Sequence, residues 1–202
     1  MGVEPWTEGE PCTRASNVLL VGETATSCKE WLPSPSVTTA SDGEDALAVA
    51  DADVDAMLIP RHCPNFSGDE LVSKLRDRGV KAPAAVVLPE GTDADVLELG
   101  FDDCVHRPLT ERKVETVLRR LIKRQTYNRL LRRYYRLVMC RTNPVIREDE
   151  SSAEARARIE AELQDVQDQL TAIESEMAAD EYEDLFRDLQ QVLNVAAERS
   201  EN

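Results

Sequence analysis

The stretch DAMLIPRHCP, residues 55–64, contains a short apolar strand, Ala56 to Ile59, that stops at Pro60. It lies in the middle of a segment, from Asn17 to about residue 125, in which apolar strands alternate with helices. Further strands are predicted at 17–21, 36–40, 84–88 and 103–105, and helices before residue 33 and at 42–50, 68–79, 92–100 and from 110 onward. This alternation predicts an α/β fold with a flavodoxin-like, doubly wound, five-stranded parallel sheet, whose sites lie at the carboxyl ends of the strands.

A long helix is predicted to follow the last strand, beginning after Thr110 and continuing to Arg141, well beyond the sheet. Pro144 interrupts it, and a helical pattern returns from Ala153 with an apolar seam at heptad spacing. The seam consists of Ile159, Leu163, Val166, Leu170, Ile173 and Met177. An amphipathic segment around Tyr182 predicts a third helix. We therefore expect a tail at 1–16, an α/β domain at 17–125 and an all-α domain at 126–197.

The charge of the chain is strongly acidic and unevenly distributed. Among 202 residues there are 39 acids and 24 bases, and 19 of the bases are Arg. This composition is typical of proteins from salt-loving organisms, with an ordinary acidic cytosolic protein as the alternative, and it argues against a general binder of nucleic acid or acidic membranes.

The two long helical segments carry opposite charge. Residues 111–141 contain 11 bases and 2 acids, whereas residues 148–188 contain 15 acids and 3 bases. We therefore expect an antiparallel helical hairpin, with a dimeric coiled coil as the alternative for the heptad helix. The basic helix also offers a candidate partner surface at Arg129, Arg132, Arg133 and Arg136.

Cysteine usage and the amino terminus predict a cytoplasmic protein. The five cysteines form no CxxC motif, the first 16 residues contain no apolar signal core, and no run of 18 apolar residues occurs. The thiol and imidazole groups near the strand ends are those of His62, Cys63, Cys104 and His106. They come as pairs on strands that the fourth strand separates, so we expect no metal and no other cofactor. The sequence contains no phosphate-binding glycine loop and no Ser/His/Asp arrangement, so we expect no enzyme.

Several motifs in this order resemble the receiver domain of two-component response regulators. They are VLLV-GE, SDGEDAL, PNFSGDEL and LGFDDCVHRP, followed by the long helix. The tail, with NRLLRRYYRLVMCR, the heptad helix and DEYEDLFRDL, resembles the HalX domain that follows receivers in halophilic archaea. The resemblance covers about residues 17–195. It implies a phosphorelay site with a nucleophilic Asp after the third strand, two acids that hold Mg²⁺, a Ser/Thr, an aromatic residue and a Lys.

This sequence departs from the receiver pattern at almost every one of these positions. Gly22 replaces one acid and leaves Glu23, and Pro60 stands at the phosphoacceptor position. The Ser/Thr, aromatic and Lys positions hold Leu88, Cys104 and Arg107. Without the nucleophile no acyl phosphate forms.

The departures predict a pseudo-receiver that acts by phosphorylation-independent protein–protein contacts, docking through its fourth and fifth helices. The expected partner is a sensor kinase, another regulator or a second copy of the chain. No association with a membrane is expected. The alternative is a DNA-binding transcriptional regulator that uses the Arg-rich helix 111–141, although no helix-turn-helix signature supports it.

The acidic composition predicts that salt stabilises the protein. With 39 acids against 24 bases, repulsion between carboxylates destabilises the fold at low ionic strength, and added salt screens this repulsion. Thermal midpoints measured from low to molar KCl should therefore rise. A midpoint that stays level or falls would remove the inference of salt adaptation.

Overall fold

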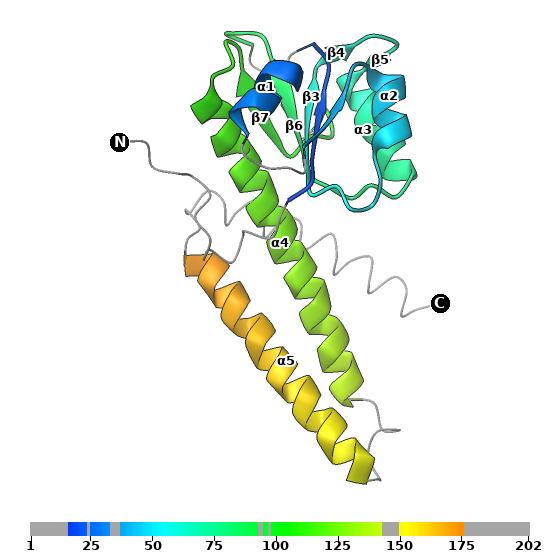
Figure 1. Cartoon of the computed structure of the whole chain (residues 1–202), viewed down its shortest axis with the longest axis vertical. Coiled ribbons are helices and arrows are strands. Elements are labelled where there is room, and N and C mark those ends of the chain that lie inside the picture. The colour runs from blue at the N-terminus through cyan, green and yellow to red at the C-terminus, as the bar shows by residue number, and fades with distance from the viewer. Residues whose placement is uncertain are drawn as a thin grey trace. The chain divides into compact units, whose positions relative to one another are not determined.

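The computed structural model describes residues 16–23, 25–32, 37–92, 95–96, 98–142 and 150–175 (Figure 1). The chain divides into two compact units, Met1–Thr126 and Tyr127–Asn202, which we call the sheet unit and the tail unit. Helix α4, Glu111–Thr142, contributes residues to both units. Among the described residues, no helix is both long and apolar enough to cross a lipid bilayer.

The sheet unit contains a parallel five-stranded sheet with the order β2-β1-β3-β6-β7. Its strands are β1 (Val18–Val21), β2 (Val37–Ala40), β3 (Ala56–Pro60), β6 (Ala84–Leu88) and β7 (Asp103–His106). In chain order of the sheet strands this is 2-1-3-4-5, so the predicted flavodoxin-like sheet is confirmed.

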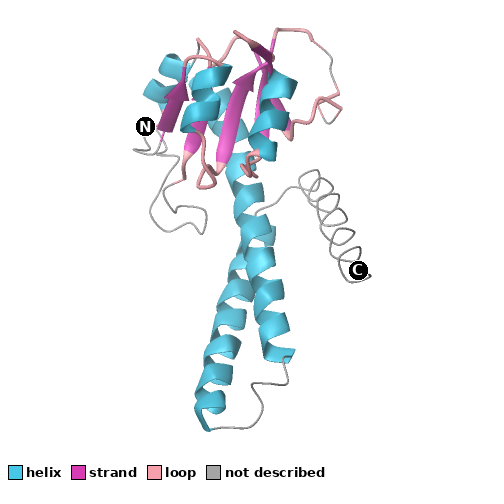
Figure 2. Ribbon diagram, turned by 90° about the vertical axis from the view of Figure 1, so that its right-hand side faces the viewer, coloured by secondary structure: helices cyan, strands magenta, loops and turns pink. Residues whose placement is uncertain are grey.

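Helices cover both faces of the sheet because alternate residues of each strand point to opposite sides. The helices are α1 (Ala25–Trp31), α2 (Gly43–Val49), α3 (Gly68–Asp77) and the first part of α4. Leu20 and Leu58 pack in one core with residues of α1 and α4, whereas Leu19 and Met57 pack in a second core with residues of α2 and α3. Figure 2 shows the strands between helices.

Local sequence signals determine where these helices begin. Asp42 caps α2 by accepting the N–H of Asp45 at 2.9 Å, as its sequence predicted. At α3 the Ser67 side chain accepts the N–H of Glu70, and the Glu70 carboxylate accepts the N–H of Ser67 at 3.1 Å. This reciprocal capping box fixes the amino end of α3 at Gly68.

At the described residues 92, 95–96 and 98–100 the chain is not helical, so the helix predicted at 92–100 does not form at these positions. The described residues of this stretch form turns, in which Asp95 accepts the N–H of Glu98 at 3.2 Å. Only two of its described residues, Val96 and Leu99, pack against the core. A stretch this short does not offset the cost of helix nucleation without more packing.

A second difference lies just after the third strand of the sheet. The PNFSG segment was expected to be a loop, but Phe66–Ser67 (β5) pairs antiparallel with His62–Cys63 (β4). Asn65 turns the chain with φ 71°, a conformation that Asn tolerates better than most residues. The ring of Phe66 lies directly against Gly43 of α2, which fixes this ribbon on the sheet unit.

The tail unit contains an antiparallel pair made by the second part of α4 and helix α5, Glu150–Ser175 (Figures 1 and 2). The Tyr127 hydroxyl donates to the Glu174 carboxylate at 2.9 Å, and Gln167 donates to the Tyr134 hydroxyl at 3.2 Å. Arg133 forms an ion pair with the carboxylate of Glu162.

The predicted helical hairpin is therefore present, with an apolar seam on α5. Leu163, Val166, Leu170 and Ile173 are buried, and Ile159 is half-buried. Met177 and the predicted third helix around residue 182 lie outside the described residues.

The seam should be the main source of stability in the tail unit. Leu163 is 5% exposed, so Leu163→Ala should destabilise the hairpin by about 2–5 kcal/mol. Its neighbour Gln164 is exposed, and Gln164→Ala should change stability by less than about 0.5 kcal/mol. Hydrogen exchange of the backbone at 127–141 and 155–175, compared with the sheet strands, measures the effect. Equal exchange in the two variants would contradict the seam as the packing contact.

Candidate functional site

The residues that replace the receiver pattern lie at the carboxyl ends of the central strands. Gly22 follows β1, Pro60 ends β3 and Leu88 ends β6. The register sets Pro60 beside Val87, and Arg107 N–H donates to the Leu88 carbonyl oxygen at 2.9 Å. These residues thus share one edge of the sheet, where ligands bind in folds of this order.

Gly22 and Pro60 are in direct contact. A Cβ built on Gly22 would lie 2.9 Å from Cγ of Pro60, which is shorter than real Cβ contacts. Gly22 also has φ +90°, a left-handed conformation that other residues adopt only with strain. The proline ring therefore occupies the space that a side chain at position 22 would need, so the residues at positions 22 and 60 are sterically coupled.

The backbone of β3 accommodates Pro60 without losing a ladder hydrogen bond. Arg61 donates its N–H to the Val87 carbonyl oxygen on β6 at 3.2 Å. Because N–H groups alternate between the two sides of a strand, the nitrogen of Pro60 faces β1. The pairing of β3 with β1 ends earlier, at Leu58. The missing N–H of proline thus falls beyond the last paired residue, where it costs nothing.

The Mg²⁺ site that the resemblance implies does not fit the residues present. Mg²⁺ requires several oxygen ligands in octahedral geometry, and Glu23 is an exposed side chain. The carboxylate of Asp42 caps α2, and the carboxylate of Asp45 accepts the N–H of Ser41 at 2.9 Å. Within the described ranges, no group of three or more His, Cys, Asp or Glu residues is placed to hold a metal ion.

Leu88 and Cys104 face the protein core. Leu88 is 1% exposed and packs in the core beneath α3, and Cys104 packs against the same core. Burial, with a smaller contribution from Asp103, raises the pKa of the Cys104 thiol. A protonated, core-facing thiol is a weak nucleophile, so neither position offers a group for phosphoryl chemistry.

The thiol of Cys63 and the imidazole groups of His62 and His106 have separate surroundings. Cys63 Sγ lies 3.8 Å from the Pro60 carbonyl oxygen, and burial together with Asp42 raises its pKa to about 11. His106 Nε2 lies 2.9 Å from the Thr92 carbonyl oxygen, and His62 is exposed. These contacts do not form a zinc site.

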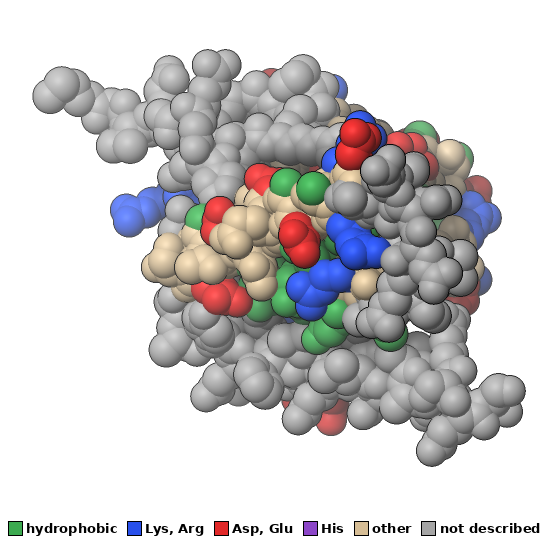
Figure 3. Space-filling model, turned by 90° about the horizontal axis from the view of Figure 1, so that it is seen from below, with side chains coloured by type: hydrophobic (Ala, Val, Ile, Leu, Met, Phe, Trp, Pro, Cys, Tyr) green, Lys and Arg blue, Asp and Glu red, His purple; other side chains and the backbone are tan. Residues whose placement is uncertain are grey.

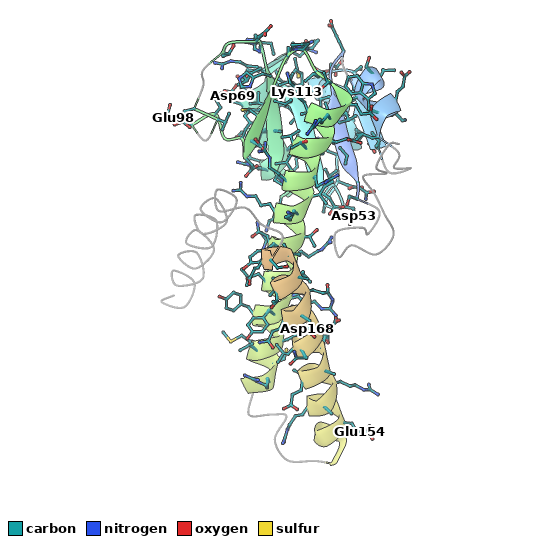
Figure 4. All side chains as sticks on the ribbon, turned by 90° about the vertical axis from the view of Figure 1, so that its left-hand side faces the viewer. Asp53, Asp69, Glu98, Lys113, Glu154 and Asp168 are labelled. Carbon is teal, nitrogen blue, oxygen red and sulfur yellow. The ribbon has the colours of Figure 1, made fainter. Side chains whose placement is uncertain are left out.

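Lys113 is a residue at this edge that sequence reasoning missed (Figure 4). Its ammonium group donates to the carbonyl oxygens of His106 and Pro108 at 3.2 and 3.0 Å. Lys113 lies in the first turn of α4, six residues after Arg107. The position of its side chain over the end of β7 depends on packing, which sequence spacing does not reveal. The guanidinium of Arg107 is exposed.

The two aspartates nearest to β3 in the sequence, Asp55 and Asp69, lie away from the carboxyl end of that strand. Asp55 precedes β3 at the amino end of the sheet, where its carboxylate accepts the N–H of Asn17 at 3.0 Å. Asp69 is exposed in the first turn of α3 (Figure 4). Neither therefore occupies the end of β3.

Solved structures share the architecture of the sheet unit. The signal receiver domain of a LuxO repressor protein from Vibrio parahaemolyticus matches with a TM-score of 0.52 and 16% identity, over 58% of this chain and 98% of that one. NtrX from Brucella abortus matches with a TM-score of 0.52 and 18% identity, over 58% of this chain and 29% of that one. The sheet unit has the receiver fold. No protein-family model matches the chain.

Sequence relatives agree with this fold. A Haloferax volcanii protein named "Putative transcriptional regulator" is 31% identical over 145 residues, which are 68% of this chain and 25% of that protein. The transcriptional regulatory protein CpxR of Klebsiella pneumoniae is 30% identical over 95 residues, 46% of this chain and 40% of that protein. The receiver domain here is therefore of response-regulator type, and the chain spans a quarter to two fifths of these two relatives.

The contact between Gly22 and Pro60 can be tested by substitution. Gly22→Ala should destabilise the protein by about 2–4 kcal/mol, because it adds a clash to the strain of a positive φ. Gly79 is the matched control, since its φ is +89° and nothing lies within 4 Å of an added Cβ. Gly79→Ala should therefore cost only about 1–2 kcal/mol. Urea denaturation provides both free energies of unfolding.

A second substitution separates the clash from the strain. Pro60→Ala made in the Gly22→Ala background should recover about 1 kcal/mol or more, because the ring that meets the new Cβ is gone. If Gly22→Ala and Gly79→Ala cost the same, and Pro60→Ala recovers nothing, the steric coupling is wrong.

Proposed function

We propose that this chain is a non-catalytic signalling protein of response-regulator type whose receiver domain acts without being phosphorylated. The observation that carries the proposal is the Pro60 ring at the end of β3, packed against Gly22. A proline ring has no oxygen to attack phosphorus, and it occupies the space beside Gly22 where a metal-binding side chain would stand. The domain then works as a pseudo-receiver, by contact with a partner.

The remaining residues of the edge support the same proposal. Leu88 is buried in the core, and partial burial raises the pKa of the Cys104 thiol. Glu23 is the one carboxylate left from the acid pair. Arg107 keeps a positive charge at the Lys position, but it has no phosphoryl group to balance. Each substitution removes a different part of the phosphorylation chemistry, so restoring any one of them would not restore the reaction.

The proposed partner is another signalling protein, a sensor kinase or a second regulator. The docking surface on the sheet unit comprises the beginning of α4 and the non-helical residues 95–96 and 98–100, which lie where the fourth helix was expected. Because these residues form no regular helix, the surface differs in shape from one made by two helices. In the tail unit, which resembles HalX domains in sequence, the exposed arginines of α4 are a second candidate surface.

DNA binding is the second candidate function, because relatives such as PhoP of Bacillus subtilis are named transcriptional regulatory proteins. Several bases of α4 are engaged within the chain, since Arg120 pairs with Asp103 at 2.8 Å and Arg133 pairs with Glu162. High intracellular salt would also weaken attraction to phosphates. This candidate would move to first place if Gln substitutions at Arg129, Arg132, Arg133 and Arg136 abolish sequence-specific DNA binding at native salt and leave stability unchanged.

Incubation with acetyl phosphate and Mg²⁺ tests the proposed function. Intact mass spectrometry should show no addition of a phosphoryl group to this chain, because position 60 offers no nucleophile. A receiver with an intact Asp, treated in parallel, should show the addition and so confirms the reagent. Phosphorylation of this chain mapped to Asp55, Asp69 or any other residue of the receiver domain would contradict the proposal.

A further inference from the structure

One side of α4 in the tail unit combines exposed apolar and basic side chains. Arg132, Tyr135, Arg136 and Met139 follow one another at intervals of three, one and three residues, which places them on one side of the helix. Tyr135 is 43% exposed and Met139 is 73% exposed, and both arginines are exposed. We call these four residues the Tyr–Arg face. Figure 3 shows Lys and Arg side chains adjoining hydrophobic ones among the described residues.

The Tyr–Arg face is separate from the contact between α4 and α5. Tyr127, Leu130 and Tyr134 contact α5 or are buried on the side toward it. At 100° per residue, the centre of the Tyr–Arg face lies about 160°, nearly half a turn, around the helix from these residues. The packing of α5 therefore does not cover the side of α4 on which Arg132, Tyr135 and Arg136 lie. Large apolar side chains exposed among cations are typical of a surface that another segment covers.

We propose that the Tyr–Arg face is a docking site for the acidic amphipathic segment 180–193 of the same chain. In this segment, apolar residues recur with the same intervals of three, one and three, at Tyr182, Leu185, Phe186 and Leu189, and Leu193 extends the row. Between 180 and 188 there are five acids and one base, which complements the positive charge of the arginines. A helix with this pattern places its apolar side on Tyr135 and Met139 and its carboxylates beside Arg132 and Arg136.

The path of the chain delivers this segment to the amino-terminal end of the face. α5 runs antiparallel to α4 and ends at Ser175, next to Glu174, whose carboxylate accepts the hydroxyl of Tyr127. A segment that turns there and runs parallel to α4 reaches the level of Met139 after 12 helical residues, about 18 Å. Residues 176–202 are long enough to turn and to cover this distance.

An intramolecular occupant is favoured over a second copy of the face. Two Tyr–Arg faces brought together would place Arg132 and Arg136 against the same cations of the other chain, which is unfavourable. A segment tethered to α5 is present at a high effective concentration, on the order of millimolar for a short connection. The tether and the opposite charge thus act in the same direction.

Paired cysteines in the full chain test this placement. In a Cys140→Ser background, Met139→Cys combined with Leu193→Cys should form an intramolecular disulfide under mild oxidation. The matched control combines Met139→Cys with Tyr182→Cys, which lies on the same side of the segment but 11 residues earlier, about 16 Å along a helix. The first pair should react at least about tenfold faster, at a rate independent of protein concentration. Non-reducing mass spectrometry of peptides identifies the bond.

Charge reversal tests the complementary part of the contact. Arg136→Glu in the Met139→Cys, Leu193→Cys chain should slow the disulfide severalfold, and Asp188→Arg added to it should restore the rate. Arg112→Glu, an exposed change of the same charge in the sheet unit, should leave the rate unchanged.

Three outcomes would overturn the placement: equal rates for the two cysteine pairs, a disulfide formed only between two chains, or no disulfide in either variant. An unchanged rate for Arg136→Glu would overturn the role of charge. None of these results depends on whether the receiver domain is phosphorylated.

Discussion

The contact of the Pro60 ring with Gly22 is the constraint on which the edge of the sheet depends. Both the backbone nitrogen and the ring of Pro60 contribute to this constraint. The strand accepts a proline at this point because its nitrogen faces β1 after the pairing of β3 with β1 has ended at Leu58. The ring then fills the space beside β1, and only a residue without Cβ, in a left-handed conformation, fits next to it. With Pro60 at this position, the space beside β1 does not admit a side chain at position 22, so a single packing arrangement constrains the residues at the ends of both strands.

The fold is insensitive to this change because its stability comes from elsewhere. The two cores lie on opposite faces of the sheet, and the residues at its carboxyl edge contribute to them through Leu88 and Cys104. The amino edge is held by polar contacts, in which the Asp102 carboxylate accepts the N–H of Ala84 at 2.8 Å and pairs with Arg76 and Arg124. Site chemistry and fold stability thus occupy opposite ends of the strands, which allows one to be replaced without loss of the other.

The sheet order followed from the alternation of strands and helices, the start of α2 from the capping residue Asp42, and the hairpin from heptad periodicity and opposite charge. The helix predicted at 92–100 does not form at the described residues of this stretch, where Val96 and Leu99 pack against the core from turns. The β4–β5 ribbon and the reach of Lys113 depend on contacts between distant residues, as with Phe66 against Gly43. At the site, the sequence identified which residues stand at the strand ends. It did not reveal that two of them touch, since that depends on the conformation of Gly22.

The basic helix shows why a count of charges is a poor guide to function. Its arginines look alike in sequence, yet they have different partners. Arg120 pairs with Asp103 in β7, Arg124 pairs with Asp102 just before β7, and Arg133 pairs with Glu162 on α5. These pairs neutralise charge inside each unit and leave less of it to act at a distance. Arg132 and Arg136 stand exposed on the same side of α4 as Tyr135 and Met139. A mixed apolar and basic surface of this kind favours an acidic amphipathic helix over a uniform phosphate backbone, which offers charge but no apolar side.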